Sequence, residues 1–241
     1  MARADKVWQK EEISKRFLDG VRQAIPFTGE QIELMLRIIR KAKPNLENFI
    51  DLGCGDAILG SAILKAFEGS FGTFIDFSET MITAANKKLA GHEAGFELLQ
   101  GDFANKSWLD VAAGKAPYDL IVSGLAIHHQ PHKRKKELYK EIFDLLTPGG
   151  LFLNLEHVAP EDPWVEEIFW DEFIQSVQDL YKSKGIDKTI EEINMEFEEP
   201  KRANILAPLE DQLTWLREIG FIHVDCYIKY FEHAMFGGVR P

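Results

Sequence analysis

The sequence predicts an α/β protein built on a mostly parallel β-sheet. Short apolar segments alternate along the chain with longer segments in which apolar residues recur every three to four positions. The first pattern is typical of strands buried on both faces of a parallel sheet, and the second of amphipathic helices. A glycine turn between one such strand and the following helix marks a connection of the kind at which α/β sheets bind ligands.

That turn follows the first predicted strand. Asn48-Phe49-Ile50-Asp51-Leu52 supplies the strand, Gly53 and Gly55 the turn, and a helix follows from Ala57. Because glycine has no Cβ, a ligand can approach the backbone closely here. The amide groups at the helix start favour negative charge.

An acidic residue ends the next predicted strand, which covers 71–76. Asp76 lies 21 positions after Gly55, and an acid at this distance suits hydrogen bonding to the two hydroxyls of an adenosine ribose. The alternative is an ordinary β-α-β turn with a solvated aspartate at the strand end. Because the glycine turn and the acid at the end of the next strand indicate the same kind of site, the sequence predicts a site for an adenosine cofactor.

Periodicity and turn residues define the other elements in order. Each later strand is a short apolar segment, and each helix carries one apolar stripe. Gly220 predicts a C-terminal cap for the last helix. A helical insertion rich in aromatic residues, 160–207, follows the fifth strand. The other predicted helices cover 5–18, 31–42, 78–89, 132–146, 187–198 (within the insertion) and 209–219. The other predicted strands cover 95–100, 118–126 (with the exit loop), 151–157, 221–231 and 232–238.

Composition narrows the class of protein. The 241 residues suit one large domain, 1–241, with a helical cap over 1–44 and a helical lid over 160–207. A net charge of −11 argues against broad affinity for nucleic acid, and the basic run 133–136 is interpreted as a solvated helix face. Two cysteines, Cys54 and Cys226, suggest no disulfide framework, so we expect a cytoplasmic protein without membrane spans.

The order Asp51-Leu52-Gly53-Cys54-Gly55 resembles the first motif of the class I S-adenosylmethionine-dependent methyltransferases. A dinucleotide fingerprint would need a third glycine at Ile58, and the segment Leu146-Thr147-Pro148-Gly149-Gly150 is a second likeness to the family. The resemblance extends over 47–241 and departs from the family at Ala57, where another glycine is common. It implies a Rossmann-like, seven-stranded, mostly parallel sheet with an antiparallel last strand, N-terminal helices and a helical insertion after the fifth strand.

The resemblance also implies roles for individual residues in binding S-adenosylmethionine. Asp51 would lie near the amino acid moiety, Asp102 would accept a hydrogen bond from the adenine amino group, and the amide of Phe103 would face the ring. Arg22 could reach the methionine carboxylate, or it could be a surface arginine. The cofactor-binding residues predicted in full are Asp51, Gly53, Cys54, Gly55, Asp76, Phe77, Asp102, Phe103, Ser123 and Arg22.

Candidate catalytic residues follow the fourth and fifth strands. His128 and His129 come after the fourth strand, and Glu156 and His157 end the fifth. Because ligands of open α/β sheets bind beyond the carboxyl ends of strands, we name His128, His129 and Glu156 as catalytic candidates. A histidine could remove a proton near neutral pH, or it could simply pack against the cofactor. We expect no metal, because no acid or cysteine lies at ligand spacing nearby.

The function predicted from these residues is methyl transfer from S-adenosylmethionine, with S-adenosylhomocysteine as product, to a small-molecule acceptor. Such a reaction depends mainly on alignment, which agrees with the lack of an evident catalytic constellation. Alternatives are a cofactor-modifying enzyme like the carboxy-S-adenosylmethionine synthases, which the C-terminal hairpin also resembles, a nicotinamide-dependent oxidoreductase, and a non-enzymatic cofactor-binding protein. The aromatic insertion could cover the acceptor, form core or join two copies in a homodimer.

Overall fold

A computed structural model describes residues 3–18, 25, 27–92 and 95–241. One seven-stranded sheet runs through the molecule in the order β3-β2-β1-β4-β5-β7-β6. The first five strands are parallel, whereas β7 pairs antiparallel with both β5 and β6. The strands are β1 (Asn48–Leu52), β2 (Phe71–Asp76), β3 (Phe96–Gln100), β4 (Tyr118–Gly124), β5 (Leu146–His157), β6 (Ile222–Tyr230) and β7 (His233–Val239).

The predicted fold class is confirmed, with one refinement at the end of the chain. The last strand, β7, lies inside the sheet between β5 and β6, so β6 forms the edge of the sheet opposite β3. β5 also begins at Leu146, earlier than the predicted strand 151–157, and pairs from there with Tyr118 of β4.

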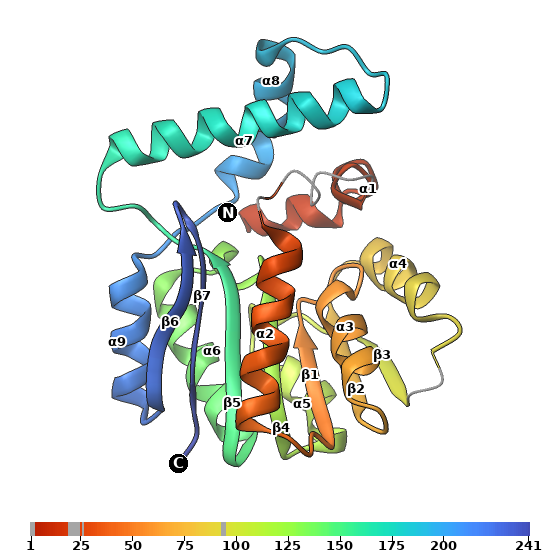
Figure 1. The fold of residues 1–241 in the computed structure, drawn as a ribbon, viewed down its shortest axis with the longest axis vertical. Coiled ribbons are helices and arrows are strands. Elements are labelled where there is room, and N and C mark those ends of the chain that lie inside the picture. The colour runs from red at the N-terminus through yellow and green to blue at the C-terminus, as the bar shows by residue number, and fades with distance from the viewer. Residues whose placement is uncertain (1–2, 19–24, 26, 93–94) are drawn as a thin grey trace.

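Helices cover both faces of the sheet (Figure 1). Alternate residues of β1 face opposite sides: Ile50 and Leu52 pack with α5, α6 and α9, whereas Phe49 packs with α2, α3 and α4. Burial on both faces explains why the central strands read as continuous apolar segments. These helices are α2 (Thr28–Ala42), α3 (Ile58–Ala66), α4 (Glu79–Leu89), α5 (Trp108–Ala112), α6 (His132–Leu145) and α9 (Leu209–Ile219).

The predicted insertion forms two helices, α7 (Pro163–Ser183) and α8 (Ile190–Arg202). Figure 1 shows both above the edge of the sheet at which the parallel strands end. They share a small apolar cluster of their own, Ile174, Val177, Ile193 and Phe197, against which Phe17 also packs. Thr189 caps α8 through a reciprocal pair of hydrogen bonds with Glu192.

The N-terminal segment differs from its prediction. The helix expected over 5–18 is divided into a 3₁₀ helix, η1 (Ala4–Gln9), and α1 (Glu11–Leu18). Lys10 between them has extended backbone angles, and the Ser14 hydroxyl donates to the Trp8 carbonyl at 2.6 Å. This contact satisfies a carbonyl at the break, so the two helices meet at an angle instead of continuing.

Among the residues that the structure describes, no helix is both long enough and apolar enough to cross a membrane.

Candidate functional site

The glycine turn lies directly over the end of β2. The amides of Gly53 and Cys54 both donate to the Ile75 carbonyl, at 2.8 and 3.0 Å. Gly53 has a φ of +67°, and a Cβ added to it would lie 2.4 Å from the Cβ of Ala126. Only glycine fits this position, because a side chain would meet both strained backbone and a neighbouring methyl group.

Asp76 joins the turn from the neighbouring strand. One carboxylate oxygen accepts the Gly55 amide at 2.9 Å and the other accepts the Ser78 amide at 2.8 Å. Burial raises the pKa of Asp76 above its usual range, and the bonds from Ser78 and Gly55 act in the opposite direction. Each oxygen keeps a lone pair for a further donor. The carboxylate is therefore held in place next to the glycine turn.

A cavity of about 180 Å³ opens in front of the turn. One end is formed by Gly53, Gly55, Asp76 and Phe77, and the other by aromatic side chains of α7 and α8. The cavity is lined further by Trp8, Met81, Phe103, Leu125, His128, His129, His157, Phe169, Trp170, Phe173, Phe197, Lys201 and His233, among others. The two bare glycines and the adjacent acid fit an adenosine ribose, and the apolar end fits a second, less polar ligand.

Three predicted cofactor residues lie behind the cavity wall. The Asp51 carboxylate accepts the Gly60 amide at 2.8 Å, so it fixes the start of α3 to β1. The Ser123 hydroxyl donates to the Leu52 carbonyl at 2.8 Å, and the Cys54 thiol is buried, with its pKa raised first by burial. These residues shape the turn from behind, and a direct contact with cofactor stays a prediction for each.

Asp102 lies in the loop after β3, next in sequence to Phe103, and Arg3 binds it there. The guanidinium donates to both Asp102 oxygens, at 2.6 and 3.0 Å, and also to Asp5. Partial burial acts to raise the pKa of Asp102, but the hydrogen bonds from Arg3 and the Ala104 amide, together with the nearby positive charges of Arg3 and Lys6, outweigh burial and the pKa is lowered. Phe103 lines the cavity beside it. Arg22 lies outside the described residues.

The histidines after β4 form the floor of the cavity. The rings of His128 and His129 lie with their centroids 3.8 Å apart and their planes tilted by 49°, and both line the cavity. His128 Nδ1 lies 2.6 Å from a Glu156 oxygen, and Asn204 provides a further side-chain hydrogen bond to the ring. Burial is the main cause that lowers the pKa of both histidines well below the usual value. They are neutral rings at physiological pH.

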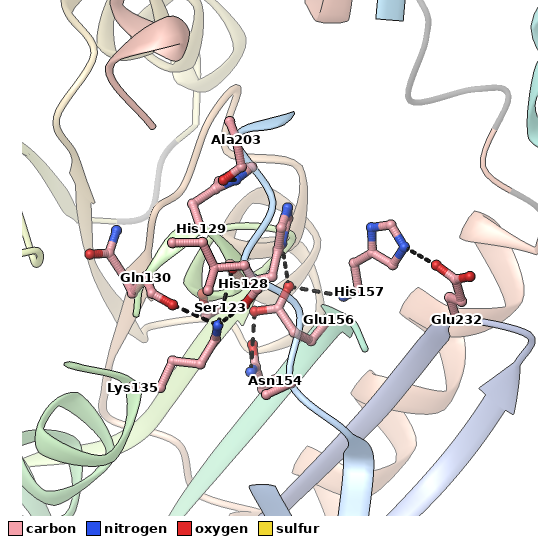
Figure 2. Close-up of polar contacts among 12 residues, drawn as sticks. Ser123, His128, His129, Gln130, Lys135, Asn154, Glu156, His157, Ala203 and Glu232 are labelled. Atoms are coloured by element: carbon pink, nitrogen blue, oxygen red, sulfur yellow. Dashed lines mark hydrogen bonds and ion pairs between the residues drawn. The ribbon is translucent and has the colours of Figure 1, made fainter. Parts of the chain in front are cut away.

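Glu156 lies behind His128 and is completely buried (Figure 2). It accepts the His157 amide at 2.9 Å, and burial raises its pKa. Of the three catalytic candidates, His128 and His129 line the cavity, whereas Glu156 is not among its lining residues and contacts His128.

Only half of the basic run at the start of α6 is the solvated face that the sequence suggests. Lys135 is fully buried, and its ammonium donates to the carbonyls of His128, Gln130 and Ile205 (Figure 2). Burial lowers its pKa to about 8. Arg134 is also buried and forms a bidentate pair with Glu141 at 2.6 and 2.7 Å. The interpretation was wrong for these two residues, because Lys135 binds the loops around the histidines and Arg134 donates to the Phe103 carbonyl at 2.9 Å. Lys133 and Lys136 are exposed, as the sequence suggests.

His157, a sequence candidate for contacting substrate, forms a second histidine–glutamate pair with Glu232, which sequence reasoning missed. His157 Nε2 lies 2.5 Å from an oxygen of Glu232, at the tip of the β6–β7 hairpin. His233, opposite His157 in the β5–β7 register, is buried with both ring nitrogens unpartnered in the described part of the chain. The sequence signal for Glu232 was weak, because the pair joins residues 75 positions apart.

No group of three or more histidine, cysteine, aspartate or glutamate side chains in the described ranges is arranged to hold a metal ion.

Comparisons with known proteins agree with this geometry. Residues 49–150 match a family described as a methyltransferase domain. The chain is 26% identical over 231 residues to the carboxy-S-adenosyl-L-methionine synthase of Nautilia profundicola, covering 94% of this chain and 91% of that protein. It is 31% identical over 134 residues to the demethylmenaquinone methyltransferase of Desulfitobacterium hafniense, covering 54% and 49%.

A solved structure shares the fold. Human N-acetylserotonin methyltransferase, determined in complex with S-adenosylmethionine, superposes with a TM-score of 0.61 at 13% identity. The match covers 97% of this chain and 57% of the human protein, so this chain spans less than two thirds of its length.

Proposed function

Because the chain belongs to the class I S-adenosylmethionine-dependent methyltransferases, we propose that it methylates a small molecule held between the glycine turn and α7–α8. The observation that carries the proposal is one continuous cavity with Gly53, Gly55 and Asp76 at one end and aromatic side chains at the other. Such a cavity can hold a donor and an acceptor end to end, as direct transfer between them requires.

The residues fit the cofactor from the ribose outward. Asp76 would accept hydrogen bonds from the ribose hydroxyls, and the turn would let the ligand lie against backbone. Asp102 retains a lone pair for the adenine amino group despite its bonds with Arg3. When bound, S-adenosylmethionine supplies an electrophilic methyl group on a sulfonium.

The chain's own contribution is to align the acceptor and exclude water. His128 and His129 would contact the reacting groups from below, with Glu156 fixing the orientation of His128. We propose that α7 and α8 act as a lid, since Phe169, Trp170 and Phe197 line the cavity from above. Alignment of this kind is worth about 7–11 kcal/mol at best.

A second candidate is modification of the cofactor itself. It is favoured by the match to the Nautilia profundicola synthase, which spans nearly the whole of both chains. A carboxylated cofactor would bring one more negative charge to the site, and Lys201 is the one lysine or arginine among the described residues that line the cavity. The Lys201 ammonium makes a cation–π contact with Trp170, 4.1 Å from the centre of the ring, at the aromatic end of the cavity. Mass spectrometry of the ligand that copurifies with the protein separates the two candidates.

The direct test is calorimetric titration with S-adenosylhomocysteine. We expect binding by the wild-type protein, and Asp76→Asn to weaken it about 10- to 100-fold, because a hydrogen bond to a charged acceptor contributes about 1.5–3 kcal/mol. The matched control is Asp56→Asn, beside the same turn, where the carboxylate pairs with Lys88. Equal affinity of wild type and Asp76→Asn would contradict the proposal.

Two further expectations belong to this function. The cysteines of the described chain are free thiols, which supports a reducing compartment such as the cytoplasm. A homodimer through the insertion remains a prediction, and light scattering of the purified protein measures it.

A further inference from the structure

The His157–Glu232 pair lies at the aromatic end of the cavity, away from the glycine turn. The rings of Phe169 and His233 lie around His157, with centroids 5.5 Å from it in both cases. The His157 side chain keeps 16% of its surface exposed, whereas Glu232 keeps 2%. His157 thus lines the cavity in which the acceptor would lie, whereas Glu232 is not among the lining residues and pairs with His157 (Figure 2).

Glu232 fixes the tautomer of His157. A carboxylate only accepts hydrogen bonds, so Nε2 carries the hydrogen that faces Glu232 at 2.5 Å. The other nitrogen, Nδ1, then has a lone pair, and it makes no hydrogen bond within the described ranges. The second oxygen of Glu232 is buried without a partner there. An imidazolium at His157 would compensate this buried charge, so the pair is built to accept a proton.

His128 is less suited to this task. Its Nδ1 faces Glu156, and the Asn204 side chain also bonds to the ring. The ring is neutral and enclosed, as a positioning or packing group should be. Of the two histidine–glutamate pairs at the ends of β4 and β5, only the one with Glu232 leaves a ring nitrogen for a ligand.

We infer that His157 is a catalytic base, positioned by Glu232, for an acceptor with a hydroxyl group on an aromatic ring. This inference rests on the proposed methyl transfer and names its acceptor class. Aromatic walls favour a planar ring, and a neutral phenol avoids adding negative charge beside Glu232.

In the reaction, the acceptor O–H bond breaks and its proton goes to His157 Nδ1. The electron pair left on the oxygen forms the new bond to the methyl carbon, and the carbon–sulfur bond breaks with its electrons staying on sulfur. The products are a methyl ether, S-adenosylhomocysteine and a protonated His157, which returns its proton to solvent.

The test uses 4-nitrophenol, whose ionised form has a visible absorption band, with the protein saturated in S-adenosylhomocysteine. Below the pH at which the free phenol ionises, we expect the wild type to bind it and the phenolate band to grow. His157→Phe should abolish the band, and Glu232→Gln should reduce it at least threefold while 4-nitrophenol still binds. Loss of a base, unlike loss of packing, changes the ionisation of the bound probe.

Three controls complete the design. His223→Phe replaces an exposed histidine of β6 and should match the wild type. The methyl ether 4-nitroanisole has no proton to give and should produce no band change. Calorimetry should give S-adenosylhomocysteine affinities within twofold for all variants.

Failures of the two proposals are distinguishable. Absence of S-adenosylhomocysteine binding would overturn the proposed function and the inference with it. The inference alone would be overturned if S-adenosylhomocysteine binds normally but 4-nitrophenol does not bind. Normal S-adenosylhomocysteine binding with no phenolate band in the wild type, or with equal bands in wild type and His157→Phe, would have the same consequence.

Discussion

Gly53 and Gly55 lie two residues apart, and the structure gives them different tasks. Both have positive φ, +67° and +54°. A Cβ on Gly53 would meet Ala126 at 2.4 Å, whereas the nearest atom to a Cβ on Gly55 is the Met81 sulfur at 4.0 Å. Gly53 is therefore required by packing, and Gly55 faces open space in the cavity.

This difference predicts separate effects of the two alanine substitutions. Gly55→Ala should cost about 1–2 kcal/mol of stability from backbone strain alone. It should also weaken S-adenosylhomocysteine binding about tenfold or more, because the methyl group enters the cofactor space. Gly53→Ala should lose about 2–5 kcal/mol, since overpacking adds to the strain. Urea denaturation and calorimetry measure both, and a Gly55→Ala protein that binds like the wild type would refute the assignment.

Ala57 shows how a departure from a motif is accommodated. It stands where the family often has glycine, and it adopts a φ of +63° at the start of α3. The backbone thus keeps the conformation that glycine would provide, at a strain of about 1–2 kcal/mol. The buried Ala57 methyl group recovers about 0.8 kcal/mol of this through burial.

The pair α7–α8 is the element that most distinguishes this chain from a bare sheet. Its apolar cluster is separate from the two clusters that flank the sheet. A Trp170–Asn194 hydrogen bond of 2.7 Å also joins the two helices. An element with its own small core can open or loosen without unfolding of the sheet.

A substitution that leaves a cavity inside that cluster should therefore destabilise α7 and α8 but not the sheet. Ile193→Ala removes a fully buried side chain of α8, and we expect a loss of about 2–5 kcal/mol in the packing of the pair. Hydrogen exchange should become faster in α7 and α8 and stay unchanged in β1 and β4. Ile186→Ala, at an exposed position between the helices, is the matched control. Equally faster exchange in the sheet would show that the insertion is not a separate unit.

Local pattern predicted the elements well, and tertiary contacts account for what it missed. The β1 turn and Asp76 were predicted because strand, glycine and acid follow one another at fixed spacing. The burial of Lys135 could not be predicted, because one of its carbonyl partners, Ile205, lies 70 positions away. The contact of Asp51 with the Gly60 amide, nine positions on, was not predicted, because the sequence assigned Asp51 only toward the cofactor.

At the scale of the whole molecule, the sheet topology explains why the surroundings of His157 could not be predicted from the sequence. β7 returns antiparallel between β5 and β6, so His233 comes to lie opposite His157. The sequence showed a hairpin at the end of the chain but not which of its strands would pair with β5. The arrangement of His157 and His233 in the cavity lining thus depends on a long-range pairing that no local pattern encodes.

The buried histidines also predict how stability depends on pH. Burial first, and then the neighbouring His157 and His128, lower the pKa of His233 to about 3 from an ordinary 6.5. Between these values the unfolded chain binds a proton that the folded protein does not, so stability falls as pH falls. The effect is about 1.4 kcal/mol per pH unit for one full proton. Burial lowers the pKa of His128 and His129 in the same sense.

Replacing His233 measures its own contribution to the pH dependence of stability. In denaturation series between about pH 6 and pH 4, His233→Phe should show a stability slope shallower than the wild type by up to about 1.4 kcal/mol per pH unit. Glu156 and Asp76, whose pKa values burial raises, favour the folded state at low pH and lose that contribution as pH rises. They affect wild type and variant alike, so the difference in slope belongs to His233. Parallel slopes would mean that His233 takes up its proton in the folded protein, and the ring would then have to face water.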